Sequence, residues 1–188
     1  NASNTPFRKF KVWLNEGGIS TPLILHWPQA IDSMQDQWIR TPAYLLDLAP
    51  TFYEVAQADY PESFNGYDVH PLEGQSLVTA MKTGQLTQHQ WMFWEHMKHR
   101  AVRYGDFKAL WQKEIGEWKL YDISKDRNEM HDLSDQYPEL LTQMTDQWEA
   151  WSWKAKVQPY GEKLKVPHAP AIPWPSDVDE KNQPKLLY

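Results

Sequence analysis

The sequence predicts an α+β fold. It combines the end of a larger α/β domain, with a remnant of its sheet and helices, and a small antiparallel sheet of about four strands packed on a C-terminal helix. Three observations predict this. A continuous apolar run over 22–27 is typical of a strand buried on both faces. Strand-like segments separated by glycine turns occupy 91–121, and 138–155 carries apolar residues at helical spacing. The run over 22–27 needs neighbouring strands, and none is evident downstream.

A helix is expected over 47–56. Asp47 is suited to cap its start, and Pro50 falls in the first turn, where a missing N–H costs nothing. The apolar residues on one face of this helix are Leu48, Phe52 and Val55. A connector rich in turn residues follows over 59–74, and a short second helix is expected over 76–82.

The segments from 91 to 121 predict the antiparallel sheet. Its strands are expected over 91–94, 100–104, 107–111 and 118–121. Gly105-Asp106 marks a hairpin turn whose residue order favours type II′ over type I′. Side chains alternate along a strand, so one side should hold Phe107, Ala109 and Trp111, and the other Lys108, Leu110 and Gln112. The helix over 138–155 should cover one face of this sheet.

Changes in composition divide the chain into three parts. Residues 1–86 are assigned to the partial large domain, 87–157 to the small sheet-and-helix subdomain, and 158–188 to a proline-rich extended tail. The tail holds six of the 14 prolines and shows almost no periodicity. It is expected to be a strap over the surface or a disordered segment.

Composition excludes several classes of protein. No apolar run approaches the roughly 20 residues that span a bilayer, so a membrane-spanning protein is excluded. A formal net charge of -6 argues against a general nucleic-acid binder. The absence of cysteine excludes disulfides, thiolate nucleophiles and cysteine-ligated zinc. The 11 tryptophans fit two interpretations, in which their rings either bind sugars through exposed faces or fill a core.

Two patterns resemble metal sites but favour other interpretations. Glu95-His96-x-x-His99 is similar to a reversed zinc-protease motif, yet it lies between strand-like segments, where its histidines need not share a face. Polar residues of a loop near the mouth of a site are the interpretation we favour. The carboxylate-rich stretch 122–135 lacks the glycine and the spacing of a calcium loop, which predicts a solvated turn with helix caps.

A basic loop precedes the apolar run. Arg8 and Lys11 lie there among aromatic residues. Loops at strand ends of α/β sheets are where ligands bind, and an ammonium there could contact a sulfate or phosphate oxygen. The alternative is a solvated basic turn.

Motifs along most of the chain resemble the sulfatase family, most closely its arylsulfatase branch. The first is Asn4-Thr5-Pro6-Phe7-Arg8-x-x-Lys11, followed by Glu16-Gly17-Gly18 and Pro22-Leu23-Ile24. The others, in the same order as in the family, lie at 47–51, 71–77, 94–108, 120–122 and 129–133. Together they span roughly residues 3 to 155, which identifies the chain as the C-terminal portion of a sulfatase.

The resemblance implies a hydrolase of sulfate esters on an alkaline-phosphatase-like scaffold. Such enzymes use a formylglycine nucleophile, made from Cys or Ser in a C/S-x-P-S-R motif, and one divalent metal, usually calcium. The chain has neither a Cys nor a Ser followed by x-Pro-x-Arg, and the family's acidic metal ligands have no counterpart in it. We therefore expect no metal ligand and no cofactor in this chain, calcium and formylglycine in the full-length parent, and an inactive fragment.

The resemblance assigns two site residues. Lys11 aligns with the catalytic lysine that contacts the sulfate and the leaving-group oxygen, whereas His96 is a substrate-binding candidate from the small sheet. Arg8 is expected to be structural or to support the residues that contact the substrate. The implied partners are a sulfated small molecule or glycan and the N-terminal catalytic portion, and the family's habit suggests a periplasmic or extracellular parent.

Three other functions stay open. A phosphate or phosphonate monoester hydrolase shares the scaffold, the tryptophan content fits a non-catalytic carbohydrate-binding module, and the chain could be an interaction protein in its own right. An unpaired apolar edge at 22–27 also predicts self-association of the fragment.

Overall fold

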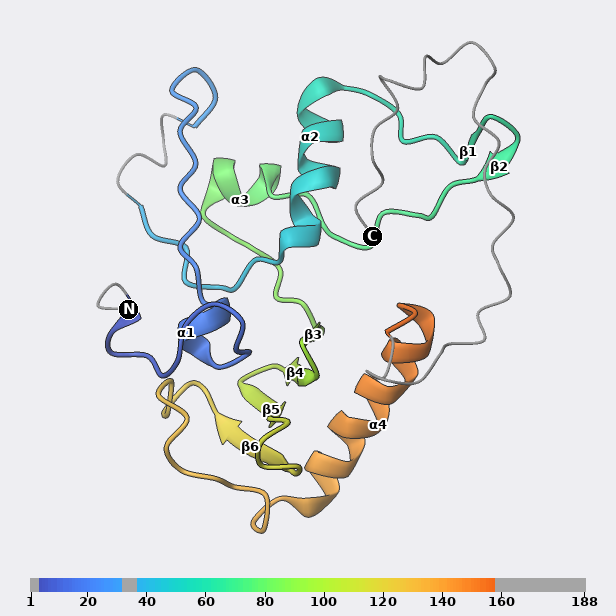
Figure 1. The fold of residues 1–188 in the computed structure, drawn as a ribbon. Coiled ribbons are helices and arrows are strands. Elements are labelled where there is room, and N and C mark those ends of the chain that lie inside the picture. The colour runs from blue at the N-terminus through green and yellow to red at the C-terminus, as the bar shows by residue number, and fades with distance from the viewer. Residues whose placement is uncertain (1–3, 32–36, 158–188) are drawn as a thin grey trace.

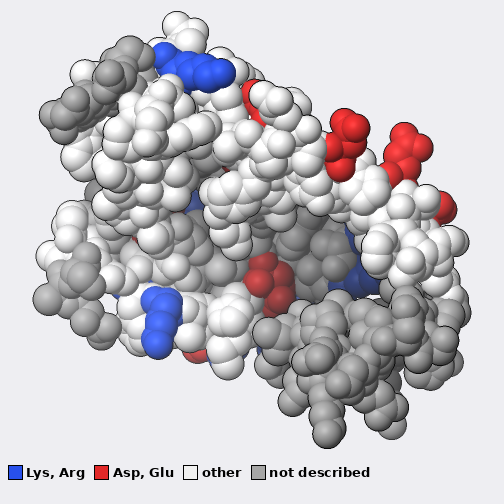
Figure 2. Space-filling view, turned by 90° about the horizontal axis from the view of Figure 1, so that it is seen from above, with Lys and Arg blue, Asp and Glu red and all other residues white. Residues whose placement is uncertain are grey.

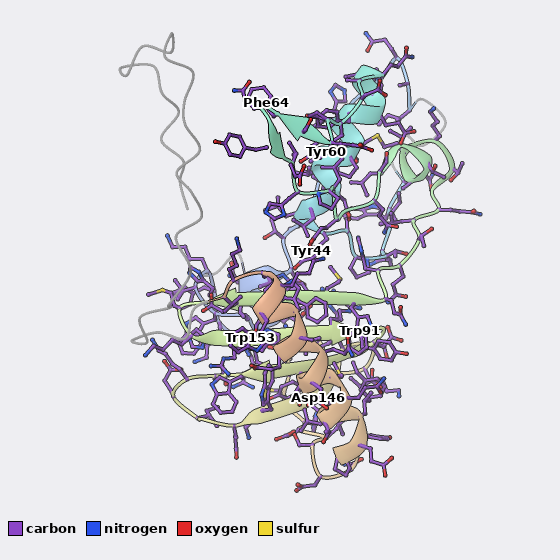
Figure 3. All side chains as sticks on the ribbon, turned by 90° about the vertical axis from the view of Figure 1, so that its right-hand side faces the viewer. Tyr44, Tyr60, Phe64, Trp91, Asp146 and Trp153 are labelled. Atoms are coloured by element: carbon purple, nitrogen blue, oxygen red, sulfur yellow. The ribbon has the colours of Figure 1, made fainter. Side chains whose placement is uncertain are left out.

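Four antiparallel strands form the central sheet of the protein, described here from a computed structural model that covers residues 4–31 and 37–157 (Figure 1). In spatial order the strands are β3 (Trp91–His96), β4 (His99–Tyr104), β5 (Phe107–Trp111) and β6 (Trp118–Asp122). The helix α4 (Pro138–Lys154) lies across one face of the sheet (Figure 3). The predicted α+β class, the four strands and the covering helix are confirmed.

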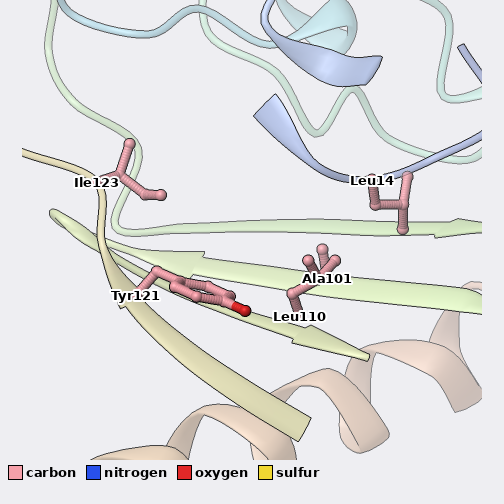
Figure 4. Packing of buried hydrophobic residues seen from close by; sticks show 5 residues of the cluster. All are labelled: Leu14, Ala101, Leu110, Tyr121 and Ile123. Atoms are coloured by element: carbon pink, nitrogen blue, oxygen red, sulfur yellow. The ribbon is translucent and has the colours of Figure 1, made fainter. Parts of the chain in front are cut away.

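Side-chain alternation divides the sheet into two apolar layers. The layer beneath α4 contains Val102, Ala109, Leu120, Met144 and Trp148. The opposite layer contains Leu14, Ala101, Leu110, Tyr121 and Ile123, and Figure 4 shows Leu14 reaching this face from the N-terminal segment. The sheet is therefore covered on one side by α4 and on the other by residues near the start of the chain.

The β4–β5 and β3–β4 hairpins differ in how clearly the sequence marks them. Tyr104 pairs with Phe107, so Gly105-Asp106 is the predicted two-residue turn, and its glycine has a φ of 57°. A positive φ at the first position only is the pattern of type II′. The β3–β4 turn instead places Met97 and Lys98 at φ values of 50° and 74°. Neither residue type signals a turn, because side chains with a Cβ adopt this region at a cost.

The remaining elements lie above the sheet in Figure 1. They are α1 (Glu16–Ile19), the 3-10 helix η3 (Leu45–Asp47), α2 (Leu48–Ala56), β1 (Ser63–Phe64), β2 (Tyr67–Asp68) and α3 (Val78–Thr83). The two helices predicted at 47–56 and 76–82 are thus present, the second shifted by a residue or two. Within the described residues, no helix has the length and apolar character needed to cross a membrane.

Asp47 joins several of these elements instead of capping α2 with its side chain. Its buried carboxylate accepts hydrogen bonds from the backbone N–H groups of Tyr44 (2.7 Å) and Gln75 (2.9 Å) and lies 2.9 Å from His89 Nε2. The Tyr44 hydroxyl donates to the carbonyl of Phe93 on β3. Figure 3 shows Tyr44 between the upper helices and the sheet, where it links the two parts.

The expected buried strand at 22–27 is absent. Its residues have no regular secondary structure, and Ile24 is 87% exposed. A strand of this kind is stabilised by backbone hydrogen bonds to neighbours, and the described chain supplies none. Phe52 and Val55 on the apolar face of α2 are exposed as well, because the described residues do not cover them. The exposed fraction of Phe52 is 65%.

Five of the ten tryptophans that the structure describes pack in the core. Rings of Trp91, Trp118, Trp148 and Trp151 pack between the sheet and α4, and Trp94 packs on the opposite face. Core filling therefore explains the tryptophan content better than a sugar-binding surface does. The proposed tail, 158–188, lies outside the described residues.

Candidate functional site

A fully buried lysine lies on the face of the sheet opposite α4. Alternation along β5 places Lys108 on the same side as Leu110 and Gln112, as expected, and its side chain is 0% exposed. Burying an ammonium costs several kcal/mol unless charges and hydrogen bonds compensate it. The surrounding residues supply both.

Two glutamates pair with this lysine. Lys108 Nζ lies 2.8 Å from Glu129 Oε1 and 3.0 Å from Glu16 Oε1, and both glutamates are buried. Glu16 begins α1, and Glu129 lies on the connection between β6 and α4. One ammonium therefore holds two segments that are 113 residues apart in sequence against the same strand.

The second oxygen of Glu129 binds the N-terminal segment directly. Glu129 Oε2 accepts hydrogen bonds from Asn15 Nδ2 at 2.7 Å and from the backbone N–H of Glu16 at 3.2 Å. The Asn15 amide oxygen accepts from Gln112 Nε2 at 2.9 Å, and Arg8 donates to the Glu129 carbonyl. Arg8 therefore makes a structural contact with the β6–α4 connection. The prediction of a solvated turn over 122–135 is wrong at Glu129, whose carboxylate is buried by residues far away in sequence.

Burial alone would raise the pKa of Glu16. The Lys108 ammonium, hydrogen bonds from Ser20 and Lys108, and the Arg127 guanidinium outweigh it, so the pKa lies below its ordinary value. A carboxyl whose pKa is lower in the folded than in the unfolded state stabilises the fold above the unfolded pKa. That contribution is lost as the pH falls through the folded pKa.

We therefore expect the free energy of unfolding of this chain to fall more steeply below about pH 4.5 than that of Glu16→Gln, since the glutamine cannot titrate. Urea denaturation of both proteins between pH 6 and pH 3 measures this. Glu16→Gln leaves the buried Lys108 paired with Glu129, which keeps the variant folded for comparison. Parallel curves over this range would contradict the role of Glu16.

Two glycines let the N-terminal segment fold back on α1. A Cβ at Gly17 would overlap the backbone carbonyl of Arg8, and one at Gly18 would overlap that of Trp13. The Gly17 N–H donates to the Arg8 carbonyl at 3.1 Å. Residues 8–18 therefore form a tight loop whose closure requires both glycines.

Lys11 lies on the exposed side of this loop. Its side chain is exposed, and within 4–31 and 37–157 it forms no ion pair or hydrogen bond. The neighbouring Trp13 packs its ring on His99, with centroids 4.5 Å apart, and Lys9 Nζ lies 4.1 Å from the centre of the Trp13 ring. Among the described residues the Lys11 ammonium is thus unpaired, whereas Lys9 and Trp13 take part in ring contacts.

His96 is exposed at the end of β3, directly opposite His99 in the β3–β4 pairing. His99 in turn contacts Trp13, so His96 lies at the end of the sheet to which the Lys11 loop is attached. No contact joins Lys11 to His96 among the residues described. Burial lowers the pKa of His99, and the nearby Lys113 and His96 act in the same direction while Glu114 opposes them.

The described residues do not fit the metal or the nucleophile that the family resemblance implies. They contain no group of three or more His, Cys, Asp or Glu that could hold a metal ion. His96 and His99 lie on adjacent strands, and only His96 is exposed, which argues against a zinc pair. The sequence has no cysteine from which formylglycine could form.

Sequence reasoning missed the Lys108–Glu16–Glu129 cluster. One signal was available, because Lys108 shares its strand face with Leu110, which the pattern places toward a core. A charged residue at such a position predicts a buried partner of opposite charge. The identity of that partner depends on tertiary structure and carries no local signature.

Comparison with known proteins gives consistent matches. Residues 7–154 match the family described as N-sulphoglucosamine sulphohydrolase, C-terminal. The chain is 31% identical over 155 residues to an uncharacterised sulfatase of Schizosaccharomyces pombe, covering 78% of this chain and 27% of that protein. It is 27% identical over 117 residues to an N-acetylglucosamine-6-O-sulfatase of Bacteroides thetaiotaomicron, covering 60% of this chain and 21% of that protein.

The fold is similar to the crystal structure of Ps i-CgsB, with a TM-score of 0.63 and 28% identity over 79% of this chain and 32% of that one. The same values hold for Ps i-CgsB in complex with k-i-k-neocarrahexaose. The chain thus spans about a third or less of the length of these proteins.

Proposed function

Because the chain belongs to the sulfatase family and corresponds to its C-terminal portion, we propose that it supplies Lys11 to the active site of a sulfuric ester hydrolase. The observation that carries this proposal is the geometry of the loop. An exposed, unpaired ammonium stands on a loop whose two flanks are bound to a buried ionic cluster. Because these contacts hold the backbone that carries Lys11, the loop need not refold for the ammonium to reach an anionic ligand.

The chemistry of sulfate esters gives this cation a role. Hydrolysis breaks the bond between sulfur and the bridging oxygen, and the electron pair of that bond goes to the departing oxygen. An ammonium fixed at this oxygen is attracted more strongly in the transition state than in the ground state, because negative charge develops there during the reaction. The ammonium of Lys11 would stabilise that charge, and the departing alcohol would finally take up a proton.

The nucleophile and the metal of the reaction lie outside this chain in our proposal. The described residues offer neither a metal-binding group nor a precursor of formylglycine, so we derive no step through either group. The chain alone is therefore proposed to be inactive, and the full-length protein is the enzyme.

The proposed substrate is a sulfate ester of a small molecule or a glycan. Support comes from proteins similar to this chain, namely an N-acetylglucosamine-6-O-sulfatase and Ps i-CgsB, whose structure holds k-i-k-neocarrahexaose. His96, exposed at the end of the sheet near the Lys11 loop, is the proposed substrate-side residue of this chain.

The proposal is tested by assaying the full-length protein on p-nitrophenyl sulfate and on p-nitrophenyl phosphate under the same conditions. We expect sulfate hydrolysis to be faster by a large factor. Faster hydrolysis of the phosphate would instead support the related phosphate monoester hydrolase.

The rest of the enzyme is proposed to dock on an apolar surface formed by residues 23–27 and 38–55. Most of the described surface in Figure 2 is neither acidic nor basic. The exposed apolar side chains of this surface are Leu23, Ile24, Leu25, Trp27, Trp38, Ile39, Leu45, Leu46, Phe52 and Val55. So many exposed apolar groups in one segment are typical of an interface.

We accordingly expect the isolated 188-residue chain to self-associate in a concentration-dependent manner, since the side chains of this surface are exposed. Size-exclusion chromatography with light scattering measures the molar mass. Phe52→Glu should shift the chain toward the monomer, whereas Trp153→Glu, which changes an exposed residue on α4, should not. A chain that stays monomeric at all concentrations would contradict the docking surface.

A further inference from the structure

We infer that Glu129 is a positioning residue of the proposed site, which fixes the backbone on both sides of Lys11 and so sets where its ammonium lies. The inference rests on the proposed function, because it assigns Glu129 a role in the same transition state. Glu129 itself makes no contact with Lys11 and would act only through the loop.

The hydrogen bonds of Glu129 bracket Lys11 in sequence. On the N-terminal side, Arg8 donates to the Glu129 carbonyl. On the C-terminal side, Asn15 Nδ2 and the backbone N–H of Glu16 donate to Glu129 Oε2. A single residue from the β6–α4 connection therefore binds the loop at both ends, three residues before Lys11 and four residues after it.

The contacts around Glu129 leave the Lys11 loop little freedom to move. Asn15 and Glu129 are both buried, and the other carboxylate oxygen of Glu129 is held 2.8 Å from Lys108 Nζ. Gln112 fixes the amide of Asn15 from β5, at 2.9 Å. Hydrogen bonds to charged groups in such surroundings are short and strong, so the loop takes its position from the rigid sheet.

The backbone on each side of Lys11 needs this support. Lys9 and Val12 have φ values of 66° and 91°, in the left-handed region that residues with a Cβ rarely adopt. A β-branched residue such as Val12 is especially unfavourable there. Strained conformations of this kind persist only where the surrounding structure imposes them. Weakening the Glu129 contacts would let the loop relax and move the ammonium.

Displacement of the ammonium has a kinetic signature. A misplacement of about 1 Å in an active site lowers the rate by about a hundredfold. The loss should be largest for substrates with poor leaving groups, because their departing oxygen carries the most negative charge in the transition state. A variant that is merely less folded would instead lose the same factor on every substrate.

The test uses Glu129→Gln in the full-length enzyme, assayed on a series of aryl sulfates whose phenols differ in pKa. Glutamine preserves the shape and leaves one positive and one negative charge in the cluster, Lys108 and Glu16. We expect kcat to fall by about tenfold to a hundredfold and KM to change less. We also expect kcat to depend more steeply on the leaving-group pKa than it does in the unaltered enzyme. Glu117→Gln, an exposed glutamate paired with Lys119, is the matched control and should leave the slope unchanged.

Lys11→Ala separates failure of this inference from failure of the proposed function. If Lys11→Ala steepens the dependence and Glu129→Gln does not, only the positioning role is overturned. If Lys11→Ala also leaves the slope unchanged, the proposed role of Lys11 is overturned together with it. Adding Glu129→Gln to Lys11→Ala should lower kcat little further, because both substitutions act through the same ammonium.

Asn15→Ala provides a second route if Glu129→Gln does not fold. It removes one of the hydrogen bonds between the loop and the Glu129 carboxylate but changes no charge in the cluster. We expect the same steepening of the leaving-group dependence. An equal loss of kcat on every aryl sulfate would overturn the inference.

Discussion

Replacing Lys11 with alanine in the full-length enzyme is expected to lower kcat for an aryl sulfate by about a hundredfold or more. In the proposed role the removed ammonium faces charge that develops on the departing oxygen, so its loss should raise the barrier without greatly weakening substrate binding. Steady-state kinetics on p-nitrophenyl sulfate, with kcat and KM determined separately, measure this.

Lys9→Ala is the matched control for this prediction. Lys9 carries the same charge on the same loop, but its ammonium lies over the Trp13 ring instead of standing unpaired. We expect a much smaller loss of kcat than for Lys11→Ala. Equal losses for the two variants would show that the loop contributes only a general positive charge, and the assignment of Lys11 as the catalytic cation would then be wrong.

Replacing Lys108 with methionine is expected to destabilise the 188-residue chain by about 3–5 kcal/mol, because two buried carboxylates lose the ammonium that compensates them. Methionine has nearly the same length, so a cavity explains little of this effect. Urea denaturation followed by tryptophan fluorescence reports the loss, since Trp148 lies in the core beneath the sheet.

Two further variants show whether uncompensated charge causes the loss. Lys125→Met removes an exposed lysine paired with Asp122 at 2.8 Å and should leave the midpoint unchanged. Combining Lys108→Met with Glu16→Gln and Glu129→Gln removes all three charges and should restore most of the stability. If the triple variant is as unstable as Lys108→Met alone, packing and not charge holds the cluster together.

The antiparallel sheet could be predicted from the sequence because its signals are local. Gly105-Asp106 marks the hairpin, and alternation from 107 to 112 assigns each residue to a face. The Met97-Lys98 turn was not marked in this way, because its positive φ values are imposed by the pairing of the flanking strands.

The run over 22–27 shows a feature that local sequence signals do not determine. Its apolar composition correctly indicates that the segment favours burial, but a strand exists only where neighbours accept its hydrogen bonds. In this chain the segment is exposed. Composition predicts that such a segment favours burial, and tertiary structure decides whether other elements bury it.

The candidate site was predictable only in part. Lys11 was found through the resemblance to a family, and the structure gives it an exposed place on a well-attached loop. The residues that hold the loop were missed because Glu129 lies in a carboxylate-rich stretch that resembles any solvated turn. Its partners, Asn15 and Lys108, are 114 and 21 residues away in sequence.

The attachment of the N-terminal loop to β5 has a mechanical consequence. Although residues 8–16 precede the helical region in sequence, their strongest contacts are with the small sheet and the connection that follows it. Any rigid-body motion of this sheet would therefore carry the Lys11 ammonium with it. The distance between that cation and a bound ester would then depend on the position of the small sheet relative to the rest of the enzyme. A hinge far from the reacting bond could in this way change the rate.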